Sequence, residues 1–297
     1  MKKLKGFTLI EISIAIAFIS ILLITIALVT TDIVSSYRKG TAMKSVNSLG
    51  LDLISDFTSS ISKAPSVTFA NFCEYYAQED ARSACNADHA YLFTFQKSKA
   101  AIYINDTTST EAPIFGAFCT GKDSYIWNTG YALNRDDYHL LDGNPIPSAT
   151  LTYSSAGETS TISNFRLLKI DDPSRMVCMT HLVDLNNDDK TYSLTNSNEF
   201  DISENIFGSE YNLSAPPTEL ITSTGSLALY DLTVFPPTQD STSKRLFYSA
   251  SMILATISGG INILSTGDYC DPTSHNFLEF DYCAVNKFNF AMRATGE

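Results

Sequence analysis

One stretch of the chain limits its possible structures more than any other: residues 7–31 form an apolar run with a single charged residue, Glu11. As a helix, these 25 residues rise about 37 Å, which is enough to cross a bilayer. Three lysines precede the run within residues 1–6, and basic residues ahead of an apolar segment hold that end in the cytoplasm. The sequence therefore predicts a single-pass membrane protein whose remaining residues lie on the extracytoplasmic side.

Two features of this run differ from an ordinary secretory signal. Such a signal ends in a cleavage site marked by small residues, whereas here the small residue, Gly6, stands before the apolar run. The acid Glu11 lies within the run, where it costs about 2.5–3.5 kcal/mol at the bilayer centre and less near the edge. Acids inside membrane segments are usually functional, so Glu11 is a candidate functional residue.

Residues 5–11 read Lys-Gly-Phe-Thr-Leu-Ile-Glu, and this heptapeptide resembles the processing signal of type IV prepilins and type II secretion pseudopilins. The resemblance implies that a prepilin peptidase removes residues 1–6 as a leader peptide, cutting between Gly6 and Phe7 and methylating Phe7. It also implies that Glu11 docks the subunit. A buried carboxylate needs a cationic partner, and the Phe7 amine of a neighbouring subunit would supply one.

The resemblance further implies a location and a set of partners. The chain would first sit in the cytoplasmic membrane with its globular domain outside the cytoplasm, and would then enter a pilus or pseudopilus filament. Its partners would be other pilins or pseudopilins, the prepilin peptidase, the inner-membrane assembly platform and the membrane itself.

Beyond the apolar run, the helical pattern continues to residue 62. Pro65 then stops it, because proline disfavours helix in the residue before it. A helix over residues 7–62 would be about 84 Å long. Gly40 and Gly50 interrupt good helix-forming sequence and are either bend points or simply tolerated. Apolar residues at three- and four-residue spacing predict an amphipathic stripe that packs on a globular domain: Val46, Leu49, Leu53, Phe57 and Ile61.

The rest of the chain, residues 63–297, shows short β-rich runs between turn residues instead of a helical period. We expect the α+β class: a long N-terminal helix, membrane-spanning in its first half, packed on an antiparallel β-rich domain. Strands are predicted at residues 91–95, 101–104, 124–127, 151–153, 165–170, 176–185, 227–235, 246–257 and 288–293. Alternation predicts two shared strand faces, one with Leu227, Leu229, Asp231, Thr233 and Phe235, the other with Phe247, Ser249, Ser251 and Ile253.

The chain has six cysteines, all beyond the apolar run: Cys73, Cys85, Cys119, Cys178, Cys270 and Cys283. An even number on the exported side suits disulfides, with buried free thiols as the alternative. Six cysteines allow 15 pairings. Loop closure favours the short loops Cys73–Cys85 and Cys270–Cys283, which leaves Cys119–Cys178 to bridge two strands.

Asp184, Asn186 and Asp188 place oxygen side chains at alternate positions, as the start of a calcium-binding EF-hand loop does. The sixth position is Asp189 instead of glycine and the twelfth is Thr195 instead of glutamate, so a solvated turn is the other reading. Calcium is the one cofactor that the sequence suggests. The four histidines have no metal-type spacing, and no catalytic motif is present, so we do not expect an enzyme.

The net charge is −12, and removing residues 1–6 leaves 17 basic against 32 acidic side chains, or −15. So acidic a protein should repel nucleic acid phosphates, and we expect no nucleic acid partner. The large head resembles that of minor subunits such as pseudopilin J. We therefore expect a structural minor pilin or pseudopilin at or near the filament tip. A tip adhesin of the same build is the alternative, and a membrane-tethered enzyme is a third hypothesis.

Overall fold

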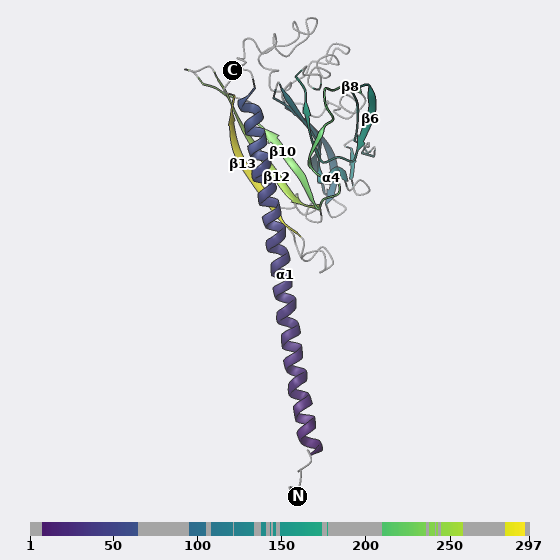
Figure 1. The fold of residues 1–297 in the computed structure, drawn as a ribbon, viewed down its shortest axis with the longest axis vertical. Coiled ribbons are helices and arrows are strands. Elements are labelled where there is room, and N and C mark those ends of the chain that lie inside the picture. Colours follow the sequence, from purple (N-terminus) through teal and green to yellow (C-terminus); the bar gives the residue numbers. More distant parts are fainter. Residues whose placement is uncertain are drawn as a thin grey trace.

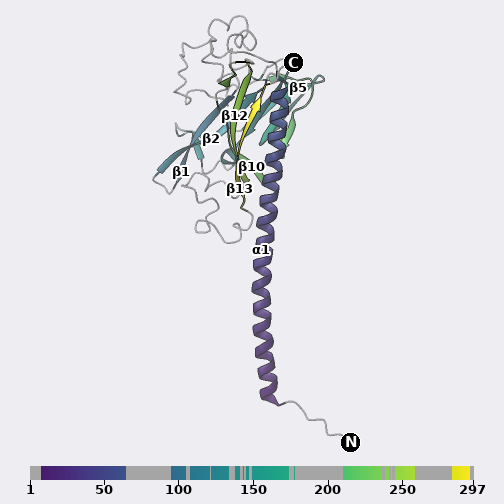
Figure 2. The ribbon, with the colours of Figure 1, turned by 90° about the vertical axis from the view of Figure 1, so that its left-hand side faces the viewer.

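The structure is a computed structural model of the 297-residue chain. It describes residues 8–64, 95–104, 108–120, 122–133, 138–140, 143, 145–146, 149–173, 177, 210–235, 238–240, 242, 245–257 and 283–294. In this part of the chain, one long helix carries a β-rich head at its C-terminal end (Figures 1 and 2). The α+β class is therefore confirmed as one long apolar N-terminal helix with largely antiparallel sheets.

The helix α1 (Leu9–Ser62) is 54 residues long, about 81 Å at 1.5 Å per residue. It begins directly after Thr8, which caps its N-terminus, and ends at Ser62 with Lys63 as its C-cap, two residues before the proline that predicted its end. Its apolar stripe is buried where predicted: Val46, Leu53, Phe57 and Ile61 are buried, and Leu49 packs beside them.

The largest sheet has six strands in the order β4-β1-β2-β3-β7-β9. Every neighbouring pair in it is antiparallel. One of its central strands, at residues 123–128, is buried on both faces, because each face is covered by a different core. The strands are β1 (Phe95–Ile104), β2 (Thr108–Cys119), β3 (Asp123–Asn128), β4 (Tyr138–Leu140), β7 (Leu167–Asp171) and β9 (Thr218–Ile221).

A four-stranded sheet lies beside the upper half of α1 (Figure 1). β12 is its centre and pairs antiparallel with the other three strands. A three-stranded sheet stands farther from the helix, and its β5–β8 pair is parallel, the one exception to the antiparallel pairing among the described strands. The strands of these two sheets are β10 (Leu227–Val234), β11 (Thr238–Gln239), β12 (Leu246–Thr256) and β13 (Val285–Arg293), then β5 (Thr150–Ser155), β6 (Glu158–Ser163) and β8 (Glu210–Asn212).

Most predicted strands overlap a strand of the structure, and the prediction missed β2, β4, β6, β8, β9 and β11. A short helix, α4 (Gly130–Leu133), was also missed. The predicted strand at residues 176–185 lies outside the described residues except for Val177. The predicted strand at residues 91–95 meets the described part of the chain only at Phe95, where β1 begins.

Two apolar cores flank the six-stranded sheet. The helix-side core joins the stripe of α1 to one face of this sheet and to the four-stranded sheet. The distal core contains no helix α1 residue and joins the opposite face to the three-stranded sheet. Phe57 marks the centre of the helix-side core: its ring stacks on Phe290 with centroids 6.2 Å apart and meets the edge of Tyr125 at 4.6 Å.

The predicted shared face of β10 is wrong beyond Leu229. A bulge shifts the register between Leu229 and Asp231, so the extra residue, Tyr230, turns into the distal core. Leu232 and Val234 then take the helix side, which the alternation had assigned to Asp231 and Thr233. The alternation in β12 does hold. The residues between the predicted ones face the helix-side core, namely Tyr248, Ala250, Met252 and Leu254, so the predicted residues share the other face.

Gly50 is a packing residue. A Cβ atom there would lie 2.2 Å from the Phe288 ring, because the ring of this β13 residue rests directly on the helix backbone. At Gly40, an added Cβ atom would meet nothing within 4 Å. The helix passes through both positions without interruption, so neither marks a break in it.

The contrast between the two glycines gives a matched test. In an exposed helix, replacing glycine by alanine stabilises by about 1 kcal/mol, and we expect Gly40→Ala to leave the head's melting temperature unchanged or slightly raised. Gly50→Ala should instead lower it, because the methyl group overpacks the Phe288 ring at a cost of about 1–3 kcal/mol. Thermal unfolding of the full chain in detergent, followed by near-ultraviolet circular dichroism, measures both. An equal or higher melting temperature for Gly50→Ala would show that this contact is not tight.

Candidate functional site

The first half of α1 contacts no other part of the described chain. Every residue from 9 to 34 is exposed, including large apolar side chains such as Phe18 at 74% and Leu28 at 62%. By length and composition, α1 is the one helix of the described residues that could cross a membrane. Soluble proteins rarely leave so large an apolar surface in water, so this half needs an apolar environment or partner on every side.

The hydroxyl groups of the exposed apolar half bond to their own helix. Five serine and threonine side chains donate to a carbonyl three or four residues earlier, over 2.7–3.0 Å: Ser13, Ser20, Thr25, Thr30 and Thr31. Polar groups are costly in lipid only when they lack a partner. These hydroxyl groups therefore need no further partner in an apolar environment.

Glu11 and Thr8 form a capping box at the first turn of α1. The Thr8 backbone N–H donates to Glu11 Oε2 over 2.8 Å, and the Thr8 hydroxyl donates to the same oxygen over 2.9 Å. In return, the Glu11 backbone N–H donates to Thr8 Oγ1 over 3.3 Å. Glu11 therefore has a structural role within its own chain besides the docking role that the resemblance implies. The Thr-x-x-Glu pattern is a known sequence signal for such a cap, and our sequence analysis missed it.

Gly6 and Phe7, the predicted processing residues, lie outside the described residues. So do the calcium candidates Asp184, Asn186 and Asp188. Among the residues that the structure does describe, no group of histidine, cysteine, aspartate or glutamate side chains could hold a metal ion.

Cys119, at the end of β2, and Cys283, just before β13, are both disulfide-bonded. The partners predicted for them, Cys178 and Cys270, lie outside the described residues, as do Cys73 and Cys85. The pairing scheme therefore stays a prediction.

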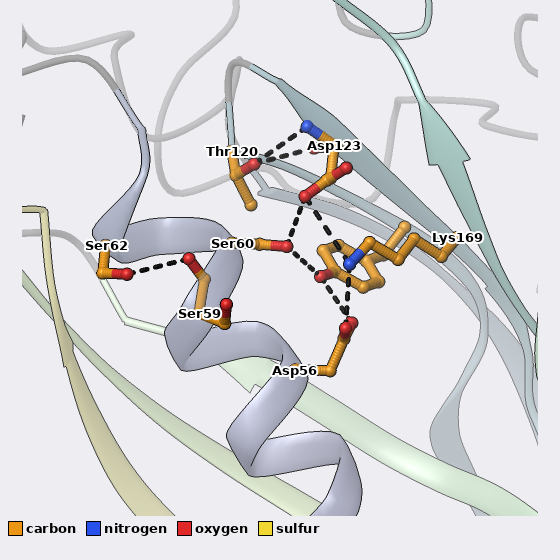
Figure 3. Close-up of polar contacts among 8 residues, drawn as sticks. Asp56, Ser59, Ser60, Ser62, Thr120, Asp123 and Lys169 are labelled. Carbon is orange, nitrogen blue, oxygen red and sulfur yellow. Dashed lines mark hydrogen bonds and ion pairs between the residues drawn. The ribbon is translucent and has the colours of Figure 1, made fainter. Parts of the chain in front are cut away.

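A polar cluster, which we call the joint, fixes the end of α1 to the six-stranded sheet (Figure 3). It consists of Asp56 and Ser60 on α1, Asp123 and Tyr125 on β3, and Lys169 on β7. Lys169 Nζ lies 2.8 Å from Asp56 Oδ1 and 3.6 Å from Asp123 Oδ2. The ammonium group thus joins a carboxylate of the helix to one of the sheet.

Tyr125 lies at the centre of the joint and is buried. Its hydroxyl oxygen is 2.7 Å from Asp56 Oδ2 and 2.6 Å from Ser60 Oγ, so one proton serves two acceptors. Ser60 in turn donates to Asp123 Oδ2. Burial raises the pKa of the Tyr125 hydroxyl well above its ordinary value, and the bond to Ser60 opposes only part of that rise. The hydroxyl therefore stays protonated and remains a donor at neutral pH.

Sequence reasoning missed the joint, although a partial signal was present. Asp56 and Ser60 lie four residues apart and border the buried stripe of the helix, where polar side chains need partners. Their partners follow between 63 and 113 residues later in the chain, and no local pattern indicates them.

Because of the joint, the head's free energy of unfolding should fall at high pH. A tyrosine whose pKa is raised by folding stabilises the fold fully below its ordinary pKa of about 10, and this contribution is lost as the pH rises above that value. Tyr125→Phe should therefore lower stability by about 1–3 kcal/mol at pH 7, because Asp56 and Ser60 lose a donor. It should also lose less stability than wild type above pH 10.

Urea unfolding of the full chain in detergent at pH 7 to 11 measures both effects. Some alkaline loss will remain in the variant, because burial also raises the pKa of Tyr248 to about 12. Tyr103→Phe, at an exposed tyrosine of β1, is the matched control and should behave as wild type. Parallel pH profiles for wild type and Tyr125→Phe would contradict the role assigned to the joint.

No protein-family model, no curated protein and no solved structure matches this chain. The function must therefore be argued from the exposed apolar helix, its capping box and the joint.

Proposed function

We propose that the chain is a minor subunit of a type IV pilus or a type II secretion pseudopilus. In this proposal a prepilin peptidase removes residues 1–6, and residues 7–31 then hold the subunit in the cytoplasmic membrane. The assembly platform afterwards transfers the helix from lipid into a filament of other pilins or pseudopilins. The head stays outside the cytoplasm throughout.

The single observation that carries the proposal is the division of α1 into two halves. The upper half buries one stripe in the head, while residues 9–34 are exposed around the whole helix. A plain membrane anchor needs an apolar surface for lipid. A subunit that leaves the membrane needs that same surface for neighbouring helices, together with a group that fixes its axial position.

Glu11 supports assembly over simple anchoring, because an uncharged glutamine could complete the same capping box in an anchor without the cost of a charge in its apolar segment. The capping box occupies Glu11 Oε2 from within the chain. It does not neutralise the carboxylate, since both donors from Thr8 are uncharged. A neighbouring subunit's Phe7 amine would supply the missing charge once residues 1–6 have been removed.

The outer face of the upper helix supports a place at or near the tip. Opposite the buried stripe, α1 exposes polar residues such as Lys44, Ser48 and Asp52. A subunit enclosed by other helices along its whole length would leave these charges in a crowded, poorly hydrated environment. At the end of a filament, this face meets water.

The first test concerns processing. The mature protein should begin at Phe7 and carry an N-methyl group, which mass spectrometry of the N-terminal peptide from membrane-extracted protein detects. Gly6→Val should block the cut and leave Met1 or Lys2 at the terminus, with the head folded as in wild type. If wild-type protein keeps residues 1–6, or is cut near Thr31 instead, the chain is not a processed pilin.

The second test separates docking from capping. Glu11→Leu removes both roles, Glu11→Gln keeps an oxygen for the cap but removes the charge, and Thr8→Val weakens the cap but keeps the charge. Loss of the charge would leave a neighbour's ammonium group buried and unpaired, at about 3–5 kcal/mol. Both Glu11 variants should therefore be cleaved and folded normally but recovered poorly in sheared filaments or in crosslinks to partner subunits.

Thr8→Val should assemble nearly as wild type, because the loss of an N-cap side chain, here with its two hydrogen bonds, costs about 1 kcal/mol. Filament recovery is measured in cells that lack the native copy and is normalised to the amount of cleaved subunit in the membrane. If Glu11→Leu assembles and functions as wild type does, Glu11 has no docking role. If Thr8→Val fails as severely as Glu11→Leu, the cap and not the charge is what assembly requires.

A further inference from the structure

Between its apolar run and the first residue buried in the head, α1 carries a short basic segment. Residues 32–45 hold Arg38, Lys39 and Lys44 against one acid, Asp32. The chain beyond it is strongly acidic, with 14 basic and 30 acidic residues over 46–297. Positive charge is therefore concentrated at one level of the helix, directly below an acidic head. We call Tyr37, Arg38, Lys39 and Lys44 the basic collar.

The basic collar is exposed and reaches around the helix. All four of its residues are exposed, and Tyr37 is 74% exposed. Tyr37 and Lys44 lie seven residues apart on one face, and Arg38 and Lys39 follow Tyr37 at steps of about 100°. Side chains that face several directions within about 10 Å along the helix axis suit a surface that surrounds the helix. A single protein partner would be served better by charges on one face.

The height of the basic collar matches one surface of a bilayer. Thr8 and Tyr37 are 29 residues apart in an unbroken helix, which corresponds to about 43 Å along its axis. A bilayer measures about 40–45 Å in total when its two headgroup regions are included. With the capping box at the cytoplasmic surface, the basic collar therefore lies at the opposite headgroup layer. Tyrosine, arginine and lysine are the residue types that anchor helices there.

We propose that the basic collar binds the phosphate groups of anionic phospholipids in the leaflet that faces the head. This inference rests on the membrane-spanning part of the proposed function. The bound phosphates would fix the depth of the helix before assembly. Val46, the first buried helix residue, lies about 10–13 Å above Tyr37, Arg38 and Lys39, and this exceeds the Debye length of about 8 Å at physiological ionic strength. Lys44 lies between these two levels and would reach the phosphates with its long side chain. The acidic head would thus be held beyond most of the repulsion from an anionic membrane surface.

The depth of the basic collar can be measured with a tryptophan in place of Tyr37. The full chain, processed and reconstituted in vesicles of phosphatidylcholine and phosphatidylglycerol, has one native tryptophan, Trp127, which is buried in the head. The parent chain therefore supplies the background. Lipids brominated near the headgroup should quench Tyr37→Trp fluorescence more strongly than lipids brominated at mid-chain. Stronger mid-chain quenching, or none by either lipid, would overturn the proposal.

The lipid preference tests the charges. Energy transfer from the tryptophan of Tyr37→Trp to trace amounts of acceptor-labelled lipid measures which lipid gathers around the basic collar. Labelled phosphatidylglycerol should be enriched there over labelled phosphatidylcholine, by up to about fivefold for each basic residue near the surface. Replacing Arg38, Lys39 and Lys44 together by glutamine should bring this ratio close to one. The control replaces three exposed head lysines by glutamine, namely Lys63, Lys122 and Lys287, and should keep the preference at an equal loss of charge.

The outcomes also separate this inference from the proposed function. If the chain inserts and is cleaved at Gly6, yet shows no lipid preference, only the role of the basic collar is wrong. If residues 1–6 stay in place or the helix does not insert, the proposed function itself fails. Zero-length crosslinks from Lys39 or Lys44 to carboxylates of a second copy, without a lipid preference, would overturn the proposal in favour of a subunit contact.

Discussion

Phe57 lies where the helix and two sheets meet, with Tyr125 against its ring on one side and Phe290 stacked on the other. The head depends on this contact, because the four-stranded and six-stranded sheets each turn an apolar face toward the same helix stripe. Truncating a buried aromatic residue costs about 3–5 kcal/mol, a large part of a typical domain's stability. The upper half of α1 therefore belongs to the core of the head, and the lower half extends from it as a continuous rod.

The two halves of α1 meet different surroundings with one unbroken backbone. In the lower half, serine and threonine hydroxyl groups bond within the helix, so its surface presents little unsatisfied polarity. In the upper half, Asp56 and Ser60 bond across to the sheet, where they fix one rotation of the helix against the head. The four residues of the basic collar, which lie between the halves, belong to neither core. This order of surfaces along one helix is what the proposed membrane insertion and assembly would use.

Much of this arrangement could be predicted from sequence, since helix period and apolar alternation are local signals. The helix end at Ser62 and strands such as β12 follow from such patterns. The edge strand β6 was missed because its exposed serine and threonine residues give it no apolar face. The bulge at Tyr230 depends on pairing with β12, and the joint depends on residues far apart in the chain. Neither could be predicted without the tertiary structure.

The way α1 lies along β13 has a mechanical consequence. The contacts between helix and head are distributed along the helix axis: Asn286 donates to Asn47 over 2.7 Å, the Phe288 ring rests on Gly50, and Lys169 pairs with Asp56 nearer the end. A pull on the head along this axis, as a tethered filament would experience, loads these contacts in shear and all at once. A sideways pull would peel them one after another. The junction between helix and head should therefore resist tension best along the helix axis.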